Sequence, residues 1–253
     1  MNGVVFGERA AFFPAHDTLV VADLHVGRDE ASAVSFPLGE REDLVARLGA
    51  ACSRFDPETV VVAGDVVHTF SDVSERSRQT LTALGEVCEA SGTVLELVAG
   101  NHDTALANAW GEPIREAVIL GASGVATGRL TDGEDEEVDT EEDGPRTVVC
   151  HGHEPPSIDA DRYVIGHVHP TIEIEGTRRP CFLHGEQTYR ESDLLVLPAF
   201  TRLAPGVSVS DIGTDACNSP LVTDVDRLAP IVFDVESEES LRFPPLGAFR
   251  RFL

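Results

Sequence analysis

The heptapeptide TVVVAGD, residues 59–65, decides the fold of this chain. A short apolar run that stops at Gly-Asp is typical of a buried strand ending in a tight turn. Similar runs occupy residues 18–23 and 93–103, and the segments 41–55 and 74–91 between them carry apolar residues at helical spacing. This β-α-β-α-β order predicts a mainly parallel sheet with right-handed crossovers.

The second half of the chain has a different pattern. After Trp110 the helical signal fades, and short apolar runs separated by turns indicate strands. We expect these strands to form a second sheet that packs on the first. No linker or internal repeat divides the sequence, so residues 1–253 are predicted to form one domain. The run TDGEDEEVDTEEDGP, residues 131–145, carries nine acidic residues and is expected to be a solvated loop.

The chain is strongly acidic. It contains 44 acidic and 19 basic residues, its formal net charge is -25, and every basic residue is arginine. Such charge opposes compaction in dilute buffer, but in molar salt the Debye length falls to about 3 Å. We interpret this composition as that of an extreme halophile's protein, with an ordinary acidic protein as the alternative. The charge is weak evidence against a nucleic-acid partner, because salt weakens phosphate contacts generally.

The N-terminal stretch and the cysteines indicate the compartment. The apolar runs are far shorter than a membrane span. Glu8, Arg9 and His16 interrupt the region where a signal peptide would be apolar, so we predict a cytoplasmic protein. The scattered cysteines form no CxxC pair, and they predict buried free thiols rather than disulfides or a thiolate metal site: Cys52, Cys88, Cys150, Cys181 and Cys217.

Side chains that bind metals follow five of the predicted strands. Because sites in open α/β sheets form beyond the carboxyl ends of strands, we expect the five turns to converge. Six of the nine histidines lie in these turns, which argues against scattered histidines without a common site. The clusters are Asp23-Leu24-His25, Gly64-Asp65, Gly100-Asn101-His102-Asp103, His151-Gly152-His153 and Gly166-His167-Val168-His169.

The residue types in these clusters favour a site with two metal ions. Imidazoles, carboxylates and one amide suit Mn²⁺, Fe, Zn²⁺, Ni²⁺ or Co²⁺ better than Ca²⁺ or Mg²⁺ alone. The set exceeds what one ion needs, so we predict two ions that share a bridging carboxylate. Two such cations lower the pKa of a water that they share. A histidine is the usual proton donor near neutral pH.

The ordered motifs DLH, GD, GNHD, HGH and GHVH, between residues 23 and 169, resemble those of the calcineurin-like metallophosphoesterase superfamily. The flanking stretches GDVVHTF, GHVHP and LPAF are similar to small single-domain archaeal phosphoesterases of the ICC-like type. The resemblance implies an α/β fold, specifically a four-layer α/β/β/α sandwich of two mixed sheets. It also implies a metal-dependent phosphoesterase.

The resemblance assigns seven metal ligands. We expect Mn²⁺ at both positions, with Fe, Zn, Ni or Co as alternatives. In HGH the residue pattern leaves open whether His151 or His153 is the ligand, and the resemblance favours His151. The resemblance implies that one ion binds Asp23, His25 and His169. The second ion is implied to bind Asn101, His151 and His167, and Asp65 is implied to bridge the two ions.

The resemblance also implies two catalytic residues. His102 is expected to stabilise the transition state or to protonate the leaving group, and Asp103 to orient its ring. Three further residues are candidates for substrate contact, each with a structural role as the alternative: Arg28, His68 and His153.

We predict a phosphodiesterase that acts on a cyclic nucleotide or a nucleic-acid-type diester, through in-line attack of a hydroxide that bridges the metals. A phosphomonoesterase or nucleotidase is the alternative, and a non-catalytic scaffold with this fold is the third reading. GDVVHTF lacks the GDxVDRG signature of protein Ser/Thr phosphatases. The expected partner is a phosphoester substrate, which includes nucleotides and nucleic acids; no membrane is expected, and a homodimer is a candidate assembly.

Overall fold

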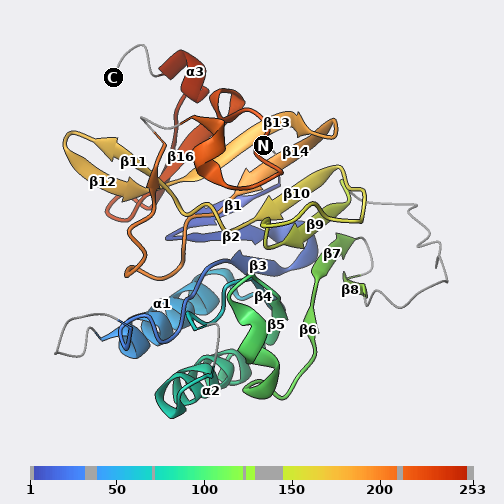
Figure 1. The fold of residues 1–253 in the computed structure, drawn as a ribbon, viewed down its shortest axis with the longest axis vertical. Helices are drawn as coiled ribbons and strands as arrows, with labels where there is room; N and C mark the ends of the chain where they lie inside the picture. The colour runs from blue at the N-terminus through green and yellow to red at the C-terminus, as the bar shows by residue number, and fades with distance from the viewer. Residues whose placement is uncertain are drawn as a thin grey trace.

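Two mixed β-sheets lie face to face in the computed structural model, and two long helices cover the outer face of the first sheet (Figure 1). The two helices, α1 and α2, lie beside β3, β4 and β5, whereas β10, β13 and β14 belong to the other sheet. The structure describes residues 3–31, 39–69, 72–121, 124–128, 145–209 and 213–249.

The first sheet has the strand order β1-β2-β3-β4-β5-β6. β1 and β2 pair antiparallel with their neighbours, whereas β3 to β6 run parallel to one another. Parallel neighbours need long crossovers, which α1 and α2 provide. The strands are β1 (Val5–Gly7), β2 (Ala10–Phe13), β3 (Thr18–Val21), β4 (Thr59–Ala63), β5 (Val94–Val98) and β6 (Ile114–Arg115).

The second sheet has the order β17-β16-β13-β14-β10-β9-β7-β8. At its centre β14, β10 and β9 run parallel, and the flanking pairs are antiparallel. Its strands are β7 (Ala117–Gly121), β8 (Gly124–Gly128), β9 (Thr147–Cys150), β10 (Arg162–Ile165), β13 (Phe182–Tyr189), β14 (Ser192–Val196), β16 (Ala229–Asp234) and β17 (Glu239–Arg242).

The core consists of apolar layers on either side of the first sheet. Leu19 and Val21 of β3 pack against the helices, while Val20 and Ala22 belong to the layer between the sheets. This alternation follows from the period of two along a strand. The helices are α1 (Glu40–Phe55) and α2 (Glu75–Ala90). The Ser74 side chain caps α2 by accepting a hydrogen bond from the N–H of Ser77 at 2.9 Å.

A further apolar layer covers the outer face of the second sheet, and only short elements supply it. Leu221, Val225 and Leu246 pack there with Tyr163 and Ile165 of β10. The elements after β10 outside this sheet include a small sheet of β12-β11-β15. The strands of the small sheet are β11 (Pro170–Ile174), β12 (Thr177–Pro180) and β15 (Val207–Ser208). The remaining helical elements are η1 (Pro14–His16), η2 (Asp103–Asn108), η3 (Thr214–Cys217), η4 (Val225–Arg227) and α3 (Leu246–Phe249).

The predicted fold class is confirmed: the structure is a mixed α/β fold of stacked mixed sheets. The five elements predicted in the first half are present within a few residues, as is the second sheet. In the α/β/β/α description the last layer consists of short helical turns rather than long helices. The acidic run 131–145 lies outside the described residues, apart from Pro145. Among the described helices, none is both long and apolar enough to cross a membrane.

The side chain of Glu40 fixes the loop that follows His25. Its carboxylate accepts hydrogen bonds from the N–H groups of Gly27 at 2.7 Å, Arg28 at 2.9 Å and Asp29 at 3.3 Å. Burial raises the pKa of Glu40 from 4.5 to about 7, although the N–H donors favour the ionised form. Because its pKa is higher in the folded state, this group stabilises the fold less as the pH rises from 4.5 to 7.

Glu40→Ala is therefore expected to lower the free energy of unfolding by about 2 kcal/mol at pH 5, because three N–H donors lose their acceptor. The loss should shrink at pH 8. Urea denaturation at constant KCl measures both values. Glu42→Ala is the matched control, since Glu42 is exposed in the same first helical turn. Equal losses in the two variants would contradict the role of Glu40.

Candidate metal centre

The turns after the parallel strands bring the predicted ligands together. β3, β4 and β5 run parallel, so their carboxyl ends lie at one edge of the first sheet. β9 and β10 run parallel in the second sheet. Backbone hydrogen bonds link these turns. Within the first sheet the N–H of Asp23 donates to the carbonyl of Gly64 at 3.0 Å, and between the sheets the N–H of Phe200 donates to the carbonyl of Ala22 at 2.7 Å.

The first group of candidate ligands comprises Asp23, His25 and His169. The Nε2 atoms of His25 and His169 lie 3.3 Å apart, and His169 Nε2 lies 3.3 Å from Asp23 Oδ1. One ligand atom from each residue lies within 4.8 Å of the others. Asp23 and His25 are buried, so their polar atoms need a partner.

The second group comprises Asn101, His151, His167 and Asp65. His151 Nε2 is its centre: it lies 3.0 Å from Asn101 Oδ1, 3.2 Å from His167 Nδ1 and 3.4 Å from Asp65 Oδ1. The ligand atoms of Asp65, His151 and His167 lie within 4.8 Å of one another. These four residues come from four different turns of the two sheets.

Asp65 contacts both groups. Its Oδ1 faces His151 Nε2 at 3.4 Å, and its Oδ2 faces His25 Nε2 at 3.8 Å. One carboxylate oxygen is thus available to each group, which is the arrangement expected of a bridging ligand. The N–H of His102 also donates to Oδ1 at 3.0 Å and fixes the carboxylate.

The donor atoms fit divalent metal ions. The carbonyl of Ala63 lies 3.1 Å from His151 Nδ1, and that of Asn218 lies 2.9 Å from His167 Nε2, so each carbonyl accepts the ring N–H. Once His151 has lost its Nε2 proton, its Nε2 and the Nδ1 of His167 present lone pairs to each other, and a cation between them would relieve this repulsion. Spacings of 3.0 to 3.4 Å also suit neighbouring ligands with metal bonds of about 2.1 Å.

Buried carboxylates dominate the electrostatics of the site. Burial opposes ionisation of Asp23 and Asp65, but the histidines around them outweigh burial and lower both pKa values. Burial also opposes protonation of His151, yet Asp65 and Asp23 raise its pKa to about 9. His151 must therefore lose a proton when its Nε2 binds a metal. Burial lowers the pKa of His25 to about 3, so that ring is neutral and ready to bind.

Five of the candidate ligands adopt a left-handed backbone. This conformation is uncommon for residues other than glycine, although Asp and His adopt it more often than most, and it clusters at functional sites. It lets consecutive residues leave the strand direction and aim at one centre. The residues are Asp23 (φ 57°), His25 (φ 47°), Asp65 (φ 48°), His167 (φ 65°) and His169 (φ 49°).

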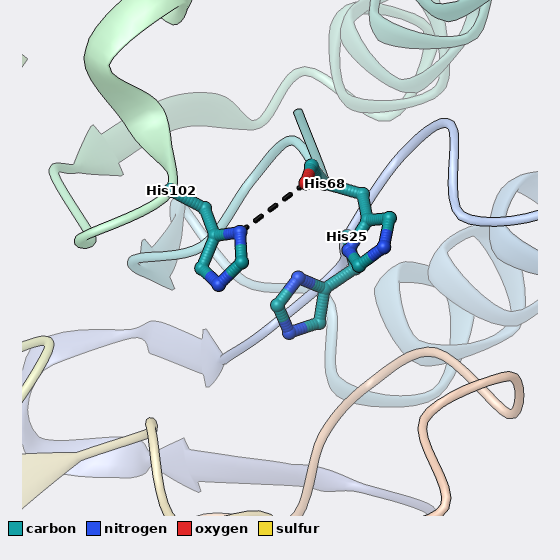
Figure 2. A group of neighbouring side chains, drawn as sticks. All are labelled: His25, His68 and His102. Carbon is teal, nitrogen blue, oxygen red and sulfur yellow. Dashed lines mark hydrogen bonds between the residues drawn. The ribbon is translucent and has the colours of Figure 1, made fainter. Parts of the chain in front are cut away.

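His102 lies beside this centre in a group of three histidines (Figure 2). Its ring stacks on that of His68, with centroids 5.7 Å apart, and meets His25 edge-on at 5.3 Å. Its Nε2 lies 3.9 Å from Asp65 Oδ2, and its Nδ1 lies 3.2 Å from the carbonyl oxygen of His68. The candidate acid–base residue therefore presents Nε2 to the candidate ligands.

Asp103 is predicted from the sequence to orient the ring of His102, but its contacts are with backbone N–H groups. Asp103 accepts hydrogen bonds from the N–H groups of Val66 at 3.2 Å, Val67 at 3.0 Å and Gly100 at 2.8 Å. It thereby ties the turn after β5 to the turn after β4. The carbonyl of His68, rather than this carboxylate, lies at His102 Nδ1.

The three candidate substrate contacts lie at different distances from the ligands. His68 joins the histidine group, and the His153 ring lies 5.2 Å from that of His151. Arg28 donates from Nε to the carbonyl of Leu203 at 3.1 Å, so part of its guanidinium links two loops of the fold. Sequence reasoning missed Asn218, because a backbone carbonyl leaves no signal in the sequence.

Two pockets border the centre. A cavity of about 360 Å³ is lined by His151 and His153, together with Glu116 and Glu154. Another of about 340 Å³ adjoins His169 and is lined by arginines and prolines. One pocket thus contacts each group of candidate ligands.

Comparison with known proteins identifies the family of the chain. A model of the calcineurin-like phosphoesterase family matches residues 16–191, more than half of the chain. The crystal structure of Pseudomonas putida nuclease MPE is similar in fold, with a TM-score of 0.53 and 21% identity over 89% of this chain and 88% of that chain. Yfce, a phosphoesterase from E. coli, has a TM-score of 0.43 and 13% identity over 90% of this chain and 98% of that chain. No curated protein sequence matches the chain.

Gly166 leaves room for the first ligand group. A Cβ atom there would lie 2.6 Å from Asp23 Oδ2 and 2.7 Å from the Cβ of Ala22. Gly166→Ala is therefore expected to displace Asp23 and to abolish the rise in melting temperature that Mn²⁺ gives over chelator, measured by differential scanning fluorimetry. Gly111→Ala is the control, because its Cβ would meet no atom within 4 Å. A Mn²⁺ effect that survives in Gly166→Ala would contradict the tight fit.

Proposed function

Because this chain belongs to the calcineurin-like phosphoesterase family, a family of metal-dependent phosphoester hydrolases, we propose that it hydrolyses phosphodiesters of the nucleic-acid type. The prediction of an enzyme is confirmed by the family match, which disfavours the non-catalytic scaffold. Whether the substrate is a diester or a monoester is the finer question. The observation that carries our proposal is the pair of pockets, one beside each ligand group.

A phosphodiester has two organic arms on the reacting phosphorus, whereas a monoester has one. The pocket beside His151 and the pocket beside His169 can each take one arm when the phosphate lies between the two ligand groups. A monoester would leave one of the pockets empty. The monoesterase or nucleotidase remains the second candidate, because the ligand set itself serves either reaction.

We propose that the site binds two divalent ions. Asp23, His25 and His169 would hold one, Asn101, His151 and His167 would hold the other, and Asp65 would bind both through its two oxygens. When bound, such ions act as Lewis acids that neutralise phosphate oxygens and lower the pKa of a water. The absence of thiolate ligands and the mixture of nitrogen and oxygen donors support manganese, with Fe, Zn, Ni or Co as alternatives.

His102 is proposed to hold the proton for the leaving alkoxide. The carbonyl of His68 accepts the hydrogen bond of Nδ1, which directs Nε2 toward Asp65 and the ligand groups. The stacked ring of His68 limits rotation of the imidazole. Asp103 acts through the backbone by fixing the turn that carries His102, and we assign it a positioning role.

The substrate class is tested by hydrolysis of a nitrophenyl phosphodiester against the matching monoester, with Mn²⁺ in molar KCl. We expect a higher kcat/KM for the diester. His102→Ala should lower kcat by about 10² to 10⁴, because it removes a general acid. His16→Ala is the control, since His16 precedes β3 at the end of the strand away from the ligands. A monoester preference would favour the phosphatase reading.

The metal count is tested by equilibrium dialysis and elemental analysis. Wild-type protein is expected to retain two ions per chain. Asp65→Asn should weaken the binding of both ions, because it removes negative charge from the shared ligand. His169→Ala should cause the loss of one ion. Loss of a single ion in Asp65→Asn would contradict a bridge. Chelation should also lower the melting temperature, because the buried carboxylates lose their cations.

A further inference from the structure

A pocket with several arginines lies next to His169 and has no role in the proposed metal site. It has a volume of about 340 Å³ and lies between β11, β12 and the segment 198–206. We call it the arginine pocket; its charged lining residues are Arg9, Arg178 and Arg202. Prolines form much of the remaining wall: Pro170, Pro180, Pro198 and Pro205.

Positive charge exceeds negative charge around the arginine pocket. Arg202 pairs with Glu8 at 2.9 Å and Asp43 at 3.3 Å, and Arg47 also contacts these two carboxylates. Arg9 donates at 2.6 Å to the carbonyl of Ala199, which carries no charge.

Arg178 adds a further cation to the pocket. It donates to the carbonyl of Pro205 at 3.3 Å, and no carboxylate of the described residues lies within ion-pair distance of it or of Arg9. Glu173 stands opposite Arg178 in the β11–β12 ladder without an ion pair, so the four arginines have three carboxylates near them, those of Glu8, Asp43 and Glu173. This excess is notable in a chain whose formal net charge is -25.

Burial and the neighbouring Arg47 lower the pKa of Arg9 to about 10. Arg9 thus remains charged at neutral pH without a full complement of negative partners. An anion in the pocket would supply that charge. Arginine suits this task because its planar fork binds phosphate oxygens through two N–H groups at once.

The pocket on the other side of the centre has the opposite character. Glu116 and Glu154 line it, and no arginine occurs among its described lining residues. A substrate with extra negative charge on one arm would therefore place that arm in the arginine pocket. The volume beside His169 is that of a site for a small organic group rather than for a single ion.

We propose that the arginine pocket binds the second phosphate of an oligonucleotide, together with the nucleoside attached to it. The scissile phosphate of that oligonucleotide would lie between the two groups of candidate ligands. The inference rests on the proposed phosphodiesterase function and narrows its substrate class. The enzyme then prefers chains with at least two phosphates over cyclic nucleotides and single diesters. The arginine contacts persist in molar salt, because hydrogen-bonded charges approach within about one Debye length of 3 Å.

The test compares two substrates that differ by one nucleotide: the thymidine dinucleotide TpT, with one phosphate, and the trinucleotide TpTpT, with two. We expect kcat/KM to be about tenfold higher for TpTpT, well above the twofold that its second cleavable bond would give. The double variant Arg178→Gln/Arg202→Gln should lose most of this advantage. Equal kcat/KM per bond for the two substrates, or an advantage that survives in the double variant, would overturn the proposal.

Arg227→Gln is the matched control. Arg227 is exposed and, like Arg178, donates to backbone carbonyls, those of Glu186 and Gln187. It should keep the full preference for TpTpT. Circular dichroism at the assay salt concentration verifies folding. Arg178→Gln alone serves as the milder variant, because Arg178 forms no ion pair within the described part of the chain.

A binding measurement separates this proposal from the hydrolysis reaction. Fluorescein-labelled TpTpT and TpT are titrated with the protein in the presence of a chelator, which prevents hydrolysis. Fluorescence anisotropy then reports the affinity for each oligonucleotide. Tighter binding of TpTpT that disappears in the double variant supports the pocket even if no diester is hydrolysed, which would reject only the proposed function. If inorganic phosphate binds as tightly as TpTpT, the pocket is a site for free anions and the proposal fails.

Discussion

The candidate site depends on backbone hydrogen bonds that hold non-glycine residues in left-handed conformations. The N–H of His25 donates to the carbonyl of Asp65 at 2.9 Å, and the N–H of Thr201 donates to that of Asp23 at 3.3 Å. Each left-handed residue costs of order 1 kcal/mol or more in isolation, so the surrounding turns must enforce it. Without these links the ligand side chains would follow their strands and point to alternate faces.

The charge distribution of the site follows from the same convergence. Buried Asp23 and Asp65 remain ionised because imidazoles from both sheets surround them. Two pockets of opposite character extend from this centre, one with carboxylates and one with arginines. A chain of high negative charge therefore contains a local concentration of arginines. The location of basic residues, rather than their number, decides which ligand the protein favours.

Local sequence signals predicted the strands, both long helices and the turns that carry the ligands. Those signals are apolar periodicity and the polar residues that follow each strand. Contacts between distant segments left no such signal. The carboxylate of Glu40 holds the loop after His25, the carbonyl of Asn218 fixes the ring of His167, and Asp103 serves backbone N–H groups. A sequence names the residue types but not which donor or acceptor a side chain reaches across the fold.

The order of the ligands along the chain has a consequence for biosynthesis. Residues 23 to 101 supply two carboxylates, one imidazole and the amide, whereas His151, His167 and His169 emerge from the ribosome later. The nascent first half therefore carries Asp23 and Asp65 without most of the imidazoles that stabilise their charge. With the proposed metal site, the three late imidazoles would complete the ligand set only after the strands of the second sheet have been synthesised. Until then, the charges of Asp23 and Asp65 lack most of the partners that stabilise them.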